Sequence, residues 1–403
     1  MPGVVVIGAG QAGASVVAKL RAEGFEGKIT LIGEEPVPPY QRPPLSKKYL
    51  LGEMALERLF LRPERFYPEA DIDLRLNTAV TGIDRAAKEV VMGDERLGYE
   101  HLVLATGSRP RRLPAAIGGD LGGVHVVRTL ADVDAMAPGF VAGARVLIVG
   151  GGYIGLEAAA VAASRGMQVV LVEMADRILQ RVAARETSDY FRALHTRHGV
   201  DIREGIGLER LLGAGQVSGA RLSDGSDLMV DMVIVGVGIT PDTALAEAAG
   251  LAIDNGIAVD AMGRTSDPAI WAVGDCASFP HEGGRLRLES VPNAIDMGDC
   301  VAGNIMGKEV AYVPRPWFWS DQYDVKLQIA GLNTGYDRIV TRSTGDEDAV
   351  SFWYFKGAQL LAVDAMNDPR AYMVGKRLID AGKTADPDLV GDAGVDLKGL
   401  LKS

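Results

Sequence analysis

Apolar runs of strand length alternate with helical stretches along most of the chain. Four such runs lie at residues 4–7, 29–32, 146–149 and 169–172. Continuous apolar runs separated by helical segments are typical of parallel strands that are buried on both faces. The pattern therefore predicts an α/β protein with two βαβ units in parallel, doubly wound sheets.

The two βαβ units form an internal repeat. The sequence G-A-G-Q-A-G begins at Gly8 and G-G-G-Y-I-G begins at Gly150, and each unit later reaches an acid, Glu34 or Glu173. Such glycines let the backbone approach a pyrophosphate, the helix N-terminus supplies N–H donors, and the acid accepts hydrogen bonds from a ribose. One glycine turn is weak evidence, because such turns also occur for structural reasons. Two copies with matched acids predict two dinucleotide sites.

Further runs complete the sheets and add a third region. Runs at 102–105, 233–235 and 270–273 end in small residues, as expected where ligands gather at the carboxyl ends of strands. After Pro314 the sequence pattern changes. Strand-like runs lie at 327–330, 338–341, 351–355 and 360–363, and a closing helix is expected at about 369–381. This last region predicts a separate α+β domain with an antiparallel sheet.

One apolar stretch, 146–163, is long enough to suggest a membrane helix. Three glycines at 150–152 interrupt it, and Glu157 lies in its middle, where a membrane helix would incur several kcal/mol. A strand, a tight turn and a buried helix are the better interpretation, and we expect no membrane association.

Composition narrows the functional classes. The 42 basic and 53 acidic residues give a net charge of −11, which argues against binding nucleic acid. Two cysteines exclude a disulfide framework and favour a reducing, cytoplasmic location, and we expect no secretory leader before the first strand. The five histidines form no metal or hydrolase constellation, so we expect no metal and interpret them as surface or boundary residues: His101, His125, His195, His198 and His281.

The first unit is continued by Ala105, Thr106 and Gly107, and later by T-S-D-P-A-I-W-A-V-G-D ending at Asp275. This arrangement resembles the two-dinucleotide flavoproteins of the glutathione-reductase-like group. The resemblance implies FAD in the first unit, with Asp275 accepting from its ribityl chain, and a nicotinamide cofactor in the second. A structural role for Asp275 as a helix N-cap is compatible with this.

Disulfide reductases of that group carry a cysteine pair beside the flavin, whereas the segment at 39–47 reads P-Y-Q-R-P-P-L-S-K and contains no sulfur. This segment, together with G-G-G-Y-I-G-L-E, E-S-V-P-N-A and P-W-F-W-S-D-Q-Y, resembles the NADH-dependent ferredoxin reductases of bacterial monooxygenases and dioxygenases. The resemblance covers nearly the whole chain. It implies FAD and NADH as cofactors, a small 2Fe–2S ferredoxin as partner and a terminal oxygenase downstream.

The resemblance also implies a domain order and site residues. We expect residues 1–112 and 240–313 to bind FAD, 113–239 to bind NAD, and 314–403 to form the C-terminal domain. The implied FAD contacts are Gly8, Gly10, Ala12, Gly13, Glu34, Arg42, Lys47, Val80, Ala105, Thr106, Gly107, Arg128, Asp275 and Val291. The implied NADH contacts are Gly150, Gly152, Ile154, Gly155, Glu157, Glu173, Gly236 and Gly238.

Some of these residues carry a specific expectation. Arg42 and Lys47 can neutralise pyrophosphate. Glu157, on the first turn of the second unit's helix, would bond the nicotinamide carboxamide or, structurally, pair with a lysine. Trp319 would lie at the flavin edge, while Trp317 would belong to the core.

Glu173 predicts a preference for NADH. A 2′-phosphate beside its carboxylate would be repelled by roughly 1 to 4 kcal/mol. Arg177 could offset this repulsion if it turned toward the ribose, but it fits better as a solvent-facing partner of Glu173.

The chain departs from the resembled family at the helix after V-P-N-A. Positive charge is expected there for docking an acidic ferredoxin, and the chain has Asp296 and Asp299 instead. Either a patch formed by Lys326, Arg285, Arg287 and Arg315 replaces it or these are ordinary solvated charges. We expect a shifted or weaker electrostatic footprint.

Two alternatives share this fold. A rubredoxin reductase would differ only in its acceptor. A regulatory NADH-binding flavoprotein of the apoptosis-inducing-factor type would differ in class, because its redox state would control assembly instead of turnover.

Overall fold

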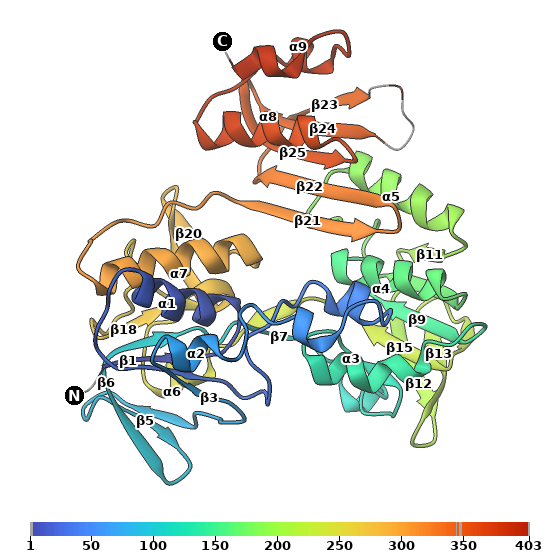
Figure 1. The fold of residues 1–403 in the computed structure, drawn as a ribbon. Helices are drawn as coiled ribbons and strands as arrows, with labels where there is room; N and C mark the ends of the chain where they lie inside the picture. The colour runs from blue at the N-terminus through green and yellow to red at the C-terminus, as the bar shows by residue number, and fades with distance from the viewer. Residues whose placement is uncertain (1–2, 344, 346–348, 402–403) are drawn as a thin grey trace. The chain divides into compact units, whose positions relative to one another are not determined.

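The computed structural model describes residues 3–343, 345 and 349–401. The predicted domain limits at residues 1 and 403 lie outside that range. The chain forms two compact units, each built from separated segments (Figure 1). Unit 1 comprises 1–41, 55–109 and 239–316, and unit 2 comprises 42–54, 110–238 and 317–403.

Unit 1 is built on a sheet in the order β3-β2-β1-β6-β5-β4, with β18 also paired to β6. The pairs β3–β2, β2–β1, β1–β6 and β6–β18 are parallel, as the apolar runs predict. The strands are β1 (Gly3–Ile7), β2 (Ile29–Ile32), β3 (Ile72–Arg75), β4 (Gly82–Asp84), β5 (Glu89–Met92), β6 (Glu95–Leu104) and β18 (Ile270–Ala272). The carboxyl end of β1 thus opens directly into the first glycine loop.

Helices cover this sheet. The helix α1 (Gln11–Ala22) follows the glycine loop and packs against α7 (Val291–Ile305). The contact is close, because a Cβ on Gly298 would lie 3.1 Å from the carbonyl oxygen of Ala12. The smaller elements of unit 1 are α2 (Phe66–Glu69), α6 (Ala244–Ala248), β16 (Ile239–Pro241), β17 (Ile257–Ala258), β19 (Ala277–His281) and β20 (Gly284–Leu286), with β7 (Ser108–Pro110) at its boundary.

Unit 2 repeats the parallel design with the order β11-β10-β9-β15-β8. Its strands are β8 (Val124–His125), β9 (Arg145–Val149), β10 (Gln168–Glu173), β11 (Asp201–Glu204) and β15 (Met232–Val235). Its helices are α3 (Leu130–Met136), α4 (Tyr153–Ser164) and α5 (Arg185–Arg197). The apolar stretch 146–163 is therefore a strand, a turn and a helix, as predicted. A small antiparallel sheet that the sequence patterns did not predict joins β12 (Leu208–Gly213), β13 (Val217–Leu222) and β14 (Asp227–Met229).

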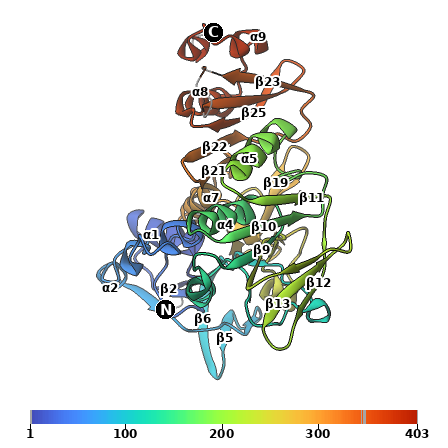
Figure 2. The same cartoon turned by 90° about the vertical axis from the view of Figure 1, so that its right-hand side faces the viewer.

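The C-terminal part of unit 2 is an antiparallel sheet in the order β21-β22-β25-β24-β23, covered by α8 (Pro369–Asp380) and α9 (Pro387–Gly391). The four predicted strand runs and the closing helix are confirmed as β22 (Val325–Gly331), β23 (Arg338–Ser343), β24 (Val350–Lys356), β25 (Gln359–Met366) and α8. An unpredicted edge strand, β21 (Trp317–Gln322), lies beside α5 with β22 (Figures 1 and 2). Its inward residues Ser320 and Gln322 are polar, which hides the usual alternation of apolar and polar side chains.

Within the described residues, no helix combines the length and the hydropathy that crossing a bilayer would need.

Candidate nucleotide-binding sites

The first glycine loop, in unit 1, is closely packed at two of its glycines and open at the third. Gly8 has φ +111°, and a Cβ there would lie 2.1 Å from the carbonyl oxygen of Ala105. A Cβ on Gly13 would lie 2.0 Å from the carbonyl oxygen of Gly8, so the helix and strand pack closely. By contrast, a Cβ on Gly10 would meet nothing within 4 Å. This open position, beside the N-terminus of α1, is where a pyrophosphate can approach the backbone.

The second loop, in unit 2, repeats this geometry position by position. Gly150 has φ +106°, and its Cβ would lie 2.4 Å from the carbonyl oxygen of Gly236. A Cβ on Gly155 would lie 2.1 Å from the carbonyl oxygen of Gly150, and one on Gly152 would meet nothing within 4 Å. The segment ending in Gly238, which has φ +99°, therefore meets the loop at Gly236. Both loops have room for a nucleotide at the middle glycine, so both fit the cofactors that the sequence implies.

The two acids differ in how firmly the fold holds them. The Glu173 carboxylate accepts hydrogen bonds from the backbone N–H of Gly151 at 2.7 Å and of Ala175 at 2.8 Å. The Glu34 side chain is 61% exposed, with the guanidinium of Arg109 3.7 Å away. Only the acid of the second unit is fixed by the loop that it follows.

Arg177 does not pair with Glu173, so that prediction was wrong. Its guanidinium instead donates to the Ser188 hydroxyl and to the backbone carbonyls of Ala183 and Ala184. These carbonyls lie just before α5, and that of Ala184 also accepts from the backbone N–H of Ser188 at 3.1 Å. Arg177 thus holds the start of α5, and its guanidinium neither pairs with Glu173 nor turns toward the expected ribose position.

Asp275 lies in unit 1 in a short helical turn after β18, and its carboxylate accepts from the Ser108 hydroxyl at 2.8 Å. It does not cap a helix, because Val273 precedes that turn and Ser290 caps α7. The N-cap prediction was therefore wrong. The neighbouring Thr106 hydroxyl donates to the carbonyl of Asp242 at 2.6 Å, and Gly107 has φ +73°.

Glu157 is a buried charge in unit 2 with three side-chain partners. It lies one residue into the second turn of α4, not on the first turn as predicted, and it is almost completely buried. The Lys47 ammonium lies 3.0 Å from its carboxylate, and the hydroxyls of Ser46 and Ser320 donate to it at 2.9 and 2.7 Å. Burial raises the pKa of Glu157, and Lys47 with the two hydroxyls opposes that rise. The structural alternative, an ion pair with a lysine, is thus present.

The two basic residues that were expected to neutralise pyrophosphate have protein partners. Lys47 bridges Glu157 and Asp321, which lies 3.5 Å from its ammonium. The Arg42 guanidinium donates to the backbone carbonyl of Arg128 at 2.6 Å. The structure therefore brings Arg42 and Arg128 together in unit 2.

The remaining predicted residues occupy varied environments. Val80 is buried in the core of unit 1, Ala12 is buried on α1, and Val291 is the first residue of α7. Ile154 is 44% exposed on the first turn of α4. Trp317 and Trp319 are both half-buried and stack with ring centroids 5.4 Å apart, so the prediction that Trp317 is a core residue was wrong.

His195 is completely buried, which contradicts the prediction of a surface or boundary residue. It lies on α5, and its imidazole is 2.8 Å from the Gln322 side-chain oxygen and 3.2 Å from the Tyr323 hydroxyl. Burial lowers the pKa of His195 to about 4. Among the described residues, no group of three or more His, Cys, Asp or Glu side chains is arranged to hold a metal ion.

Two of the charges considered for partner docking, Arg285 and Arg287, have structural roles. On α7 of unit 1, Asp296 is exposed and Asp299 is half-buried. The guanidinium of Arg287 lies 2.6 Å from Glu289 and donates to the carbonyl of Asp275, so Arg287 is not a freely solvated charge. Arg285 donates to the carbonyl of Val259, while Lys326 is exposed in unit 2.

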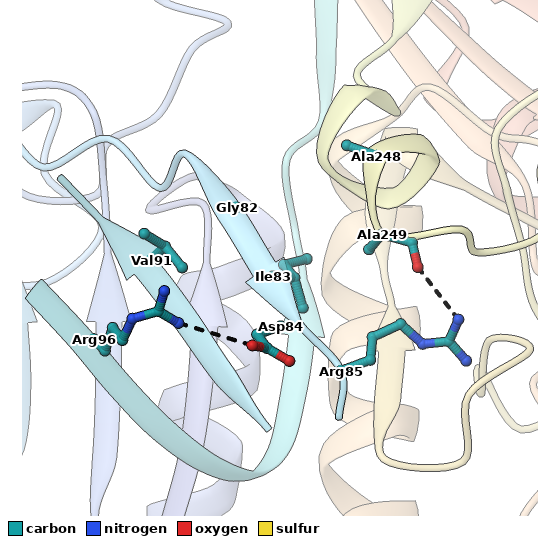
Figure 3. Close-up of a pocket in the computed structure, with 8 residues that line it drawn as sticks. All are labelled: Gly82, Ile83, Asp84, Arg85, Val91, Arg96, Ala248 and Ala249. Carbon is teal, nitrogen blue, oxygen red and sulfur yellow. Dashed lines mark hydrogen bonds and ion pairs between the residues drawn. The ribbon is translucent and has the colours of Figure 1, made fainter. Parts of the chain in front are cut away.

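A hollow of about 530 Å³ in unit 1 contains none of the predicted site residues (Figure 3). It lies between the β4–β5 hairpin and the end of α6. Its two arginines, Arg85 and Arg96, are paired with Asp267 and with Asp84 and Glu89. Because these charges are already compensated within the protein, the hollow gives no indication of a ligand.

Sequence reasoning missed Ser46, Ser320 and Gln322. Hydroxyls and amides carry no periodic signal of their own, and their role depends on distant segments meeting at Glu157. The only signal for these segments was the family resemblance of the two motifs that contain the three residues, P-Y-Q-R-P-P-L-S-K and P-W-F-W-S-D-Q-Y.

Comparison with known proteins gives consistent matches. The family model described as pyridine nucleotide-disulphide oxidoreductase matches residues 2–298, and a reductase C-terminal model matches 317–401. The chain is 42% identical to putidaredoxin reductase of Pseudomonas putida, over 99% of this chain and 96% of that one. It is 40% identical to the ferredoxin–NAD(+) reductase component of the anthranilate 1,2-dioxygenase system of Burkholderia cepacia, over 98% of both. The crystal structure of the covalent putidaredoxin reductase–putidaredoxin complex matches with a TM-score of 0.96 and 41% identity, over 100% of this chain and 98% of that one.

Proposed function

Since the chain belongs to the pyridine nucleotide-disulphide oxidoreductase family, and within it to the ferredoxin reductases of oxygenase systems, we propose that it carries electrons from NADH through FAD to a small iron–sulfur protein. The observation that carries this proposal is the duplicated glycine loop, open at Gly10 and again at Gly152. Two nucleotide sites in one chain without a cysteine pair in the segment 39–47 are what direct transfer between two cofactors requires.

The family matches confirm the predicted fold class, two Rossmann-like nucleotide-binding domains with a C-terminal α+β domain. They also confirm an oxidoreductase that uses FAD and NAD(P)H. The domain limits remain our proposal: 1–112 with 240–313 for FAD, 113–239 for NAD, and 314–403 for the C-terminal domain.

For FAD, we assign the adenosine half to unit 1. Gly8, Gly10 and Gly13 would receive the pyrophosphate at the start of α1, and the exposed Glu34 carboxylate would accept from ribose hydroxyls. Asp275, already held by Ser108, would accept from the ribityl chain. The other FAD contacts that we propose are Ala12, Arg42, Lys47, Val80, Ala105, Thr106, Gly107, Arg128 and Val291.

For NADH, we assign the pyrophosphate to the loop of Gly150, Gly152 and Gly155, with Ile154, Gly236 and Gly238 as further contacts. Glu173 would accept from the adenosine ribose. Because two backbone N–H groups fix its carboxylate, it cannot easily turn away from a 2′-phosphate, and the preference for NADH follows. Arg177 cannot offset this effect, since its donors are used near α5.

Bound FAD supplies the chemistry of accepting a hydride and giving up electrons singly. The protein supplies position and electrostatics. Glu157, held by Lys47, Ser46 and Ser320, would accept from the nicotinamide carboxamide, and Trp319 would cover the edge of the flavin site. No side chain is required to move a proton for hydride transfer itself.

We propose a 2Fe–2S ferredoxin as the partner, with a terminal oxygenase downstream, in the reducing cytoplasm that suits two free cysteines. The similarity to putidaredoxin reductase, to a dioxygenase-system ferredoxin reductase and to the putidaredoxin reductase–putidaredoxin complex supports this partner class. The exposed Asp296 on α7 leads us to expect a weak electrostatic contribution to docking.

Steady-state reduction of cytochrome c through a 2Fe–2S ferredoxin, measured against ionic strength, tests the partner. We expect ferredoxin-dependent turnover that falls only mildly with salt. Turnover with a rubredoxin and none with a ferredoxin would mean that rubredoxin is the acceptor. Failure to turn over with ferricyanide, together with a long-lived reduced NAD complex, would favour the regulatory alternative and contradict an enzyme.

A further inference from the structure

A continuous line of buried hydrogen bonds in unit 2 leads from the β21–β22 turn to Glu157. The Tyr323 hydroxyl lies 3.2 Å from Nδ1 of His195, and Nε2 of His195 lies 2.8 Å from Oε1 of Gln322. Nε2 of Gln322 donates to the Ser320 hydroxyl at 3.1 Å, and that hydroxyl donates to Glu157 at 2.7 Å. The imidazole, the amide and the Ser320 hydroxyl are all almost completely buried.

Every donor in this line faces the same way. The side-chain oxygen of Gln322 can only accept, so Nε2 of His195 must carry the imidazole proton. Nδ1 is then the acceptor, and the Tyr323 hydroxyl must donate to it. Because Ser320 receives a hydrogen bond from the Gln322 amide, its own proton is left for the Glu157 carboxylate. The last hydrogen bond of the line is therefore donated by Ser320 to the Glu157 carboxylate.

The fold holds both ends of this line. The sheet alternation turns Ser320 and Gln322 of β21 inward, while Asp321 between them faces Lys47. Tyr323 has φ +55°, a conformation that tyrosine rarely adopts, and its ring stacks on His198, the residue that follows α5, with centroids 3.6 Å apart. Strain of this kind persists only where the surroundings require it. The turn thus fixes the Tyr323 hydroxyl against His195.

We propose that His195 and Gln322 are positioning residues, which hold Ser320 as a fixed donor to Glu157 and so orient its carboxylate for the nicotinamide. This rests on the proposed function, in which Glu157 contacts NADH. Without the amide of Gln322, the Ser320 hydroxyl is free to turn, and one of the three groups that hold the Glu157 carboxylate is no longer fixed in direction. Hydride transfer depends steeply on such alignment.

The test is anaerobic rapid mixing of the FAD-loaded enzyme with NADH, which yields the flavin reduction rate and the NADH dissociation constant. We expect Gln322→Met to slow reduction about fivefold, the effect of one lost orienting hydrogen bond. Gln322→Glu should slow it at least tenfold, because a carboxylate there attracts the Ser320 proton away from Glu157. His195→Gln, which keeps an N–H near Nε2, should be closer to the unsubstituted enzyme than His195→Ala.

A double-mutant cycle separates positioning from general loosening. If Gln322 acts through Ser320, Gln322→Met should have no further effect on flavin reduction in a Ser320→Ala background. Ser351→Ala is the matched control, because Ser351 is an equally buried hydroxyl of the same sheet that bonds Asp368 and Trp353 instead. Its reduction rate should be unchanged. Equal slowing by Gln322→Met in both backgrounds would overturn the proposal, and so would unchanged rates in both Gln322 variants.

A failure of the proposed function can be distinguished from a failure of the positioning role. If NADH does not reduce the flavin of the unsubstituted enzyme, the assignment of the cofactors is wrong, whatever the cycle shows. If NADH reduces it and the cycle is additive, only the positioning role is wrong. Should Gln322→Glu not fold, Gln322→Met and the two His195 variants still decide the question.

Discussion

The helices of the two βαβ units start from matching glycine loops and then differ in what surrounds them. In unit 1, α1 packs on its sheet and on α7, and Ser15 is half-buried close to α7, where a Cβ on Gly298 would lie 3.2 Å from the Ser15 Cβ. In unit 2, α4 is buried continuously from Gly155 to Ala162, and Glu157 stands where α1 has Ser15. The loop geometry is the common nucleotide-binding part. The added packing on α4 is what allows a charged group to be held inside the second unit.

This difference shows that the second βαβ unit differs from the first mainly in the segments that pack on its helix. The segment 45–49 and β21 both pack on α4, and each brings a hydroxyl to Glu157. A buried carboxylate is costly unless its acceptors are used. Here an ammonium and two hydroxyls meet that need, so the charge can be kept for function at a fixed position.

The largest effects should come from closing either glycine loop. In Gly8→Val and Gly150→Val, a branched side chain would collide with the backbone oxygen of Ala105 or Gly236, at positive φ in both cases. We expect at least a hundredfold weaker binding of the nucleotide in the affected unit. Flavin absorbance of the purified variants should be lost for Gly8→Val only. A Gly150→Val variant that is reduced by NADH at the normal rate would contradict the assignment of the second loop.

The next effect concerns the charge that distinguishes the helices. Glu157→Gln leaves the Lys47 ammonium without its nearest carboxylate, and removing one partner of a buried pair typically costs roughly 3 to 5 kcal/mol. Lys47 keeps its contact with Asp321 and is partly exposed, so we expect a loss of unfolding free energy at the lower end of that range, measured by urea unfolding. Flavin reduction by NADH should also be slower. Ser15→Ala, at the matching position of α1, should change stability by less than about 0.5 kcal/mol. Comparable losses in the two variants would remove the contrast.

The two ribose acids provide a smaller contrast. Glu173→Gln should reduce the preference for NADH over NADPH roughly tenfold, because the repulsion of a 2′-phosphate is removed. Glu34→Gln should leave that ratio unchanged, since it lies in the unit assigned to FAD. The ratio of kcat/KM for the two cofactors is the measurement. A shift of the ratio in Glu34→Gln would mean that the units are assigned in the wrong order.

The smallest effect is a pH dependence of stability within unit 2. Burial raises the pKa of Asp364 to about 6, against hydrogen bonds from the hydroxyls of Tyr354 and Thr187. A carboxyl whose pKa is higher in the folded state favours the fold while protonated, so this contribution is present at pH 4 and is lost as the pH rises through about 6. Asp364→Asn should therefore show less loss of unfolding free energy than the unsubstituted protein between pH 4 and 6.5. The lowered pKa of His195 acts with opposite sign in the same range, so the comparison requires His195 in both proteins.

The sequence was sufficient for the parts of this molecule that repeat or alternate. The glycine loops, the parallel strands and the four strands β22 to β25 each follow from local patterns, because burial on both faces or on one face dictates them. The strand β21 was missed because its inward residues, Ser320 and Gln322, are polar and bond each other and residues of α4 and α5.

The candidate site divides in the same way. Gly10, Gly152 and Glu173 could be found from spacing, since backbone geometry fixes their surroundings. The burial of His195 and the Ser108 partner of Asp275 could not be found, because each depends on segments far apart in sequence. The partners of Arg177 lie within 11 residues of it, but their spacing carries no signal. Side-chain hydrogen bonds of that kind leave no periodic trace in the chain.

The central claim is that two open glycine loops hold FAD and NADH for direct electron transfer. Anaerobic titration of the purified protein with NADH, followed by flavin absorbance, tests it most directly. We expect a yellow protein whose flavin absorbance is bleached by about one equivalent of NADH, and by NADPH only at much higher concentration. A colourless protein that does not bind added FAD, or a flavin that stays oxidised in excess NADH, would contradict the claim.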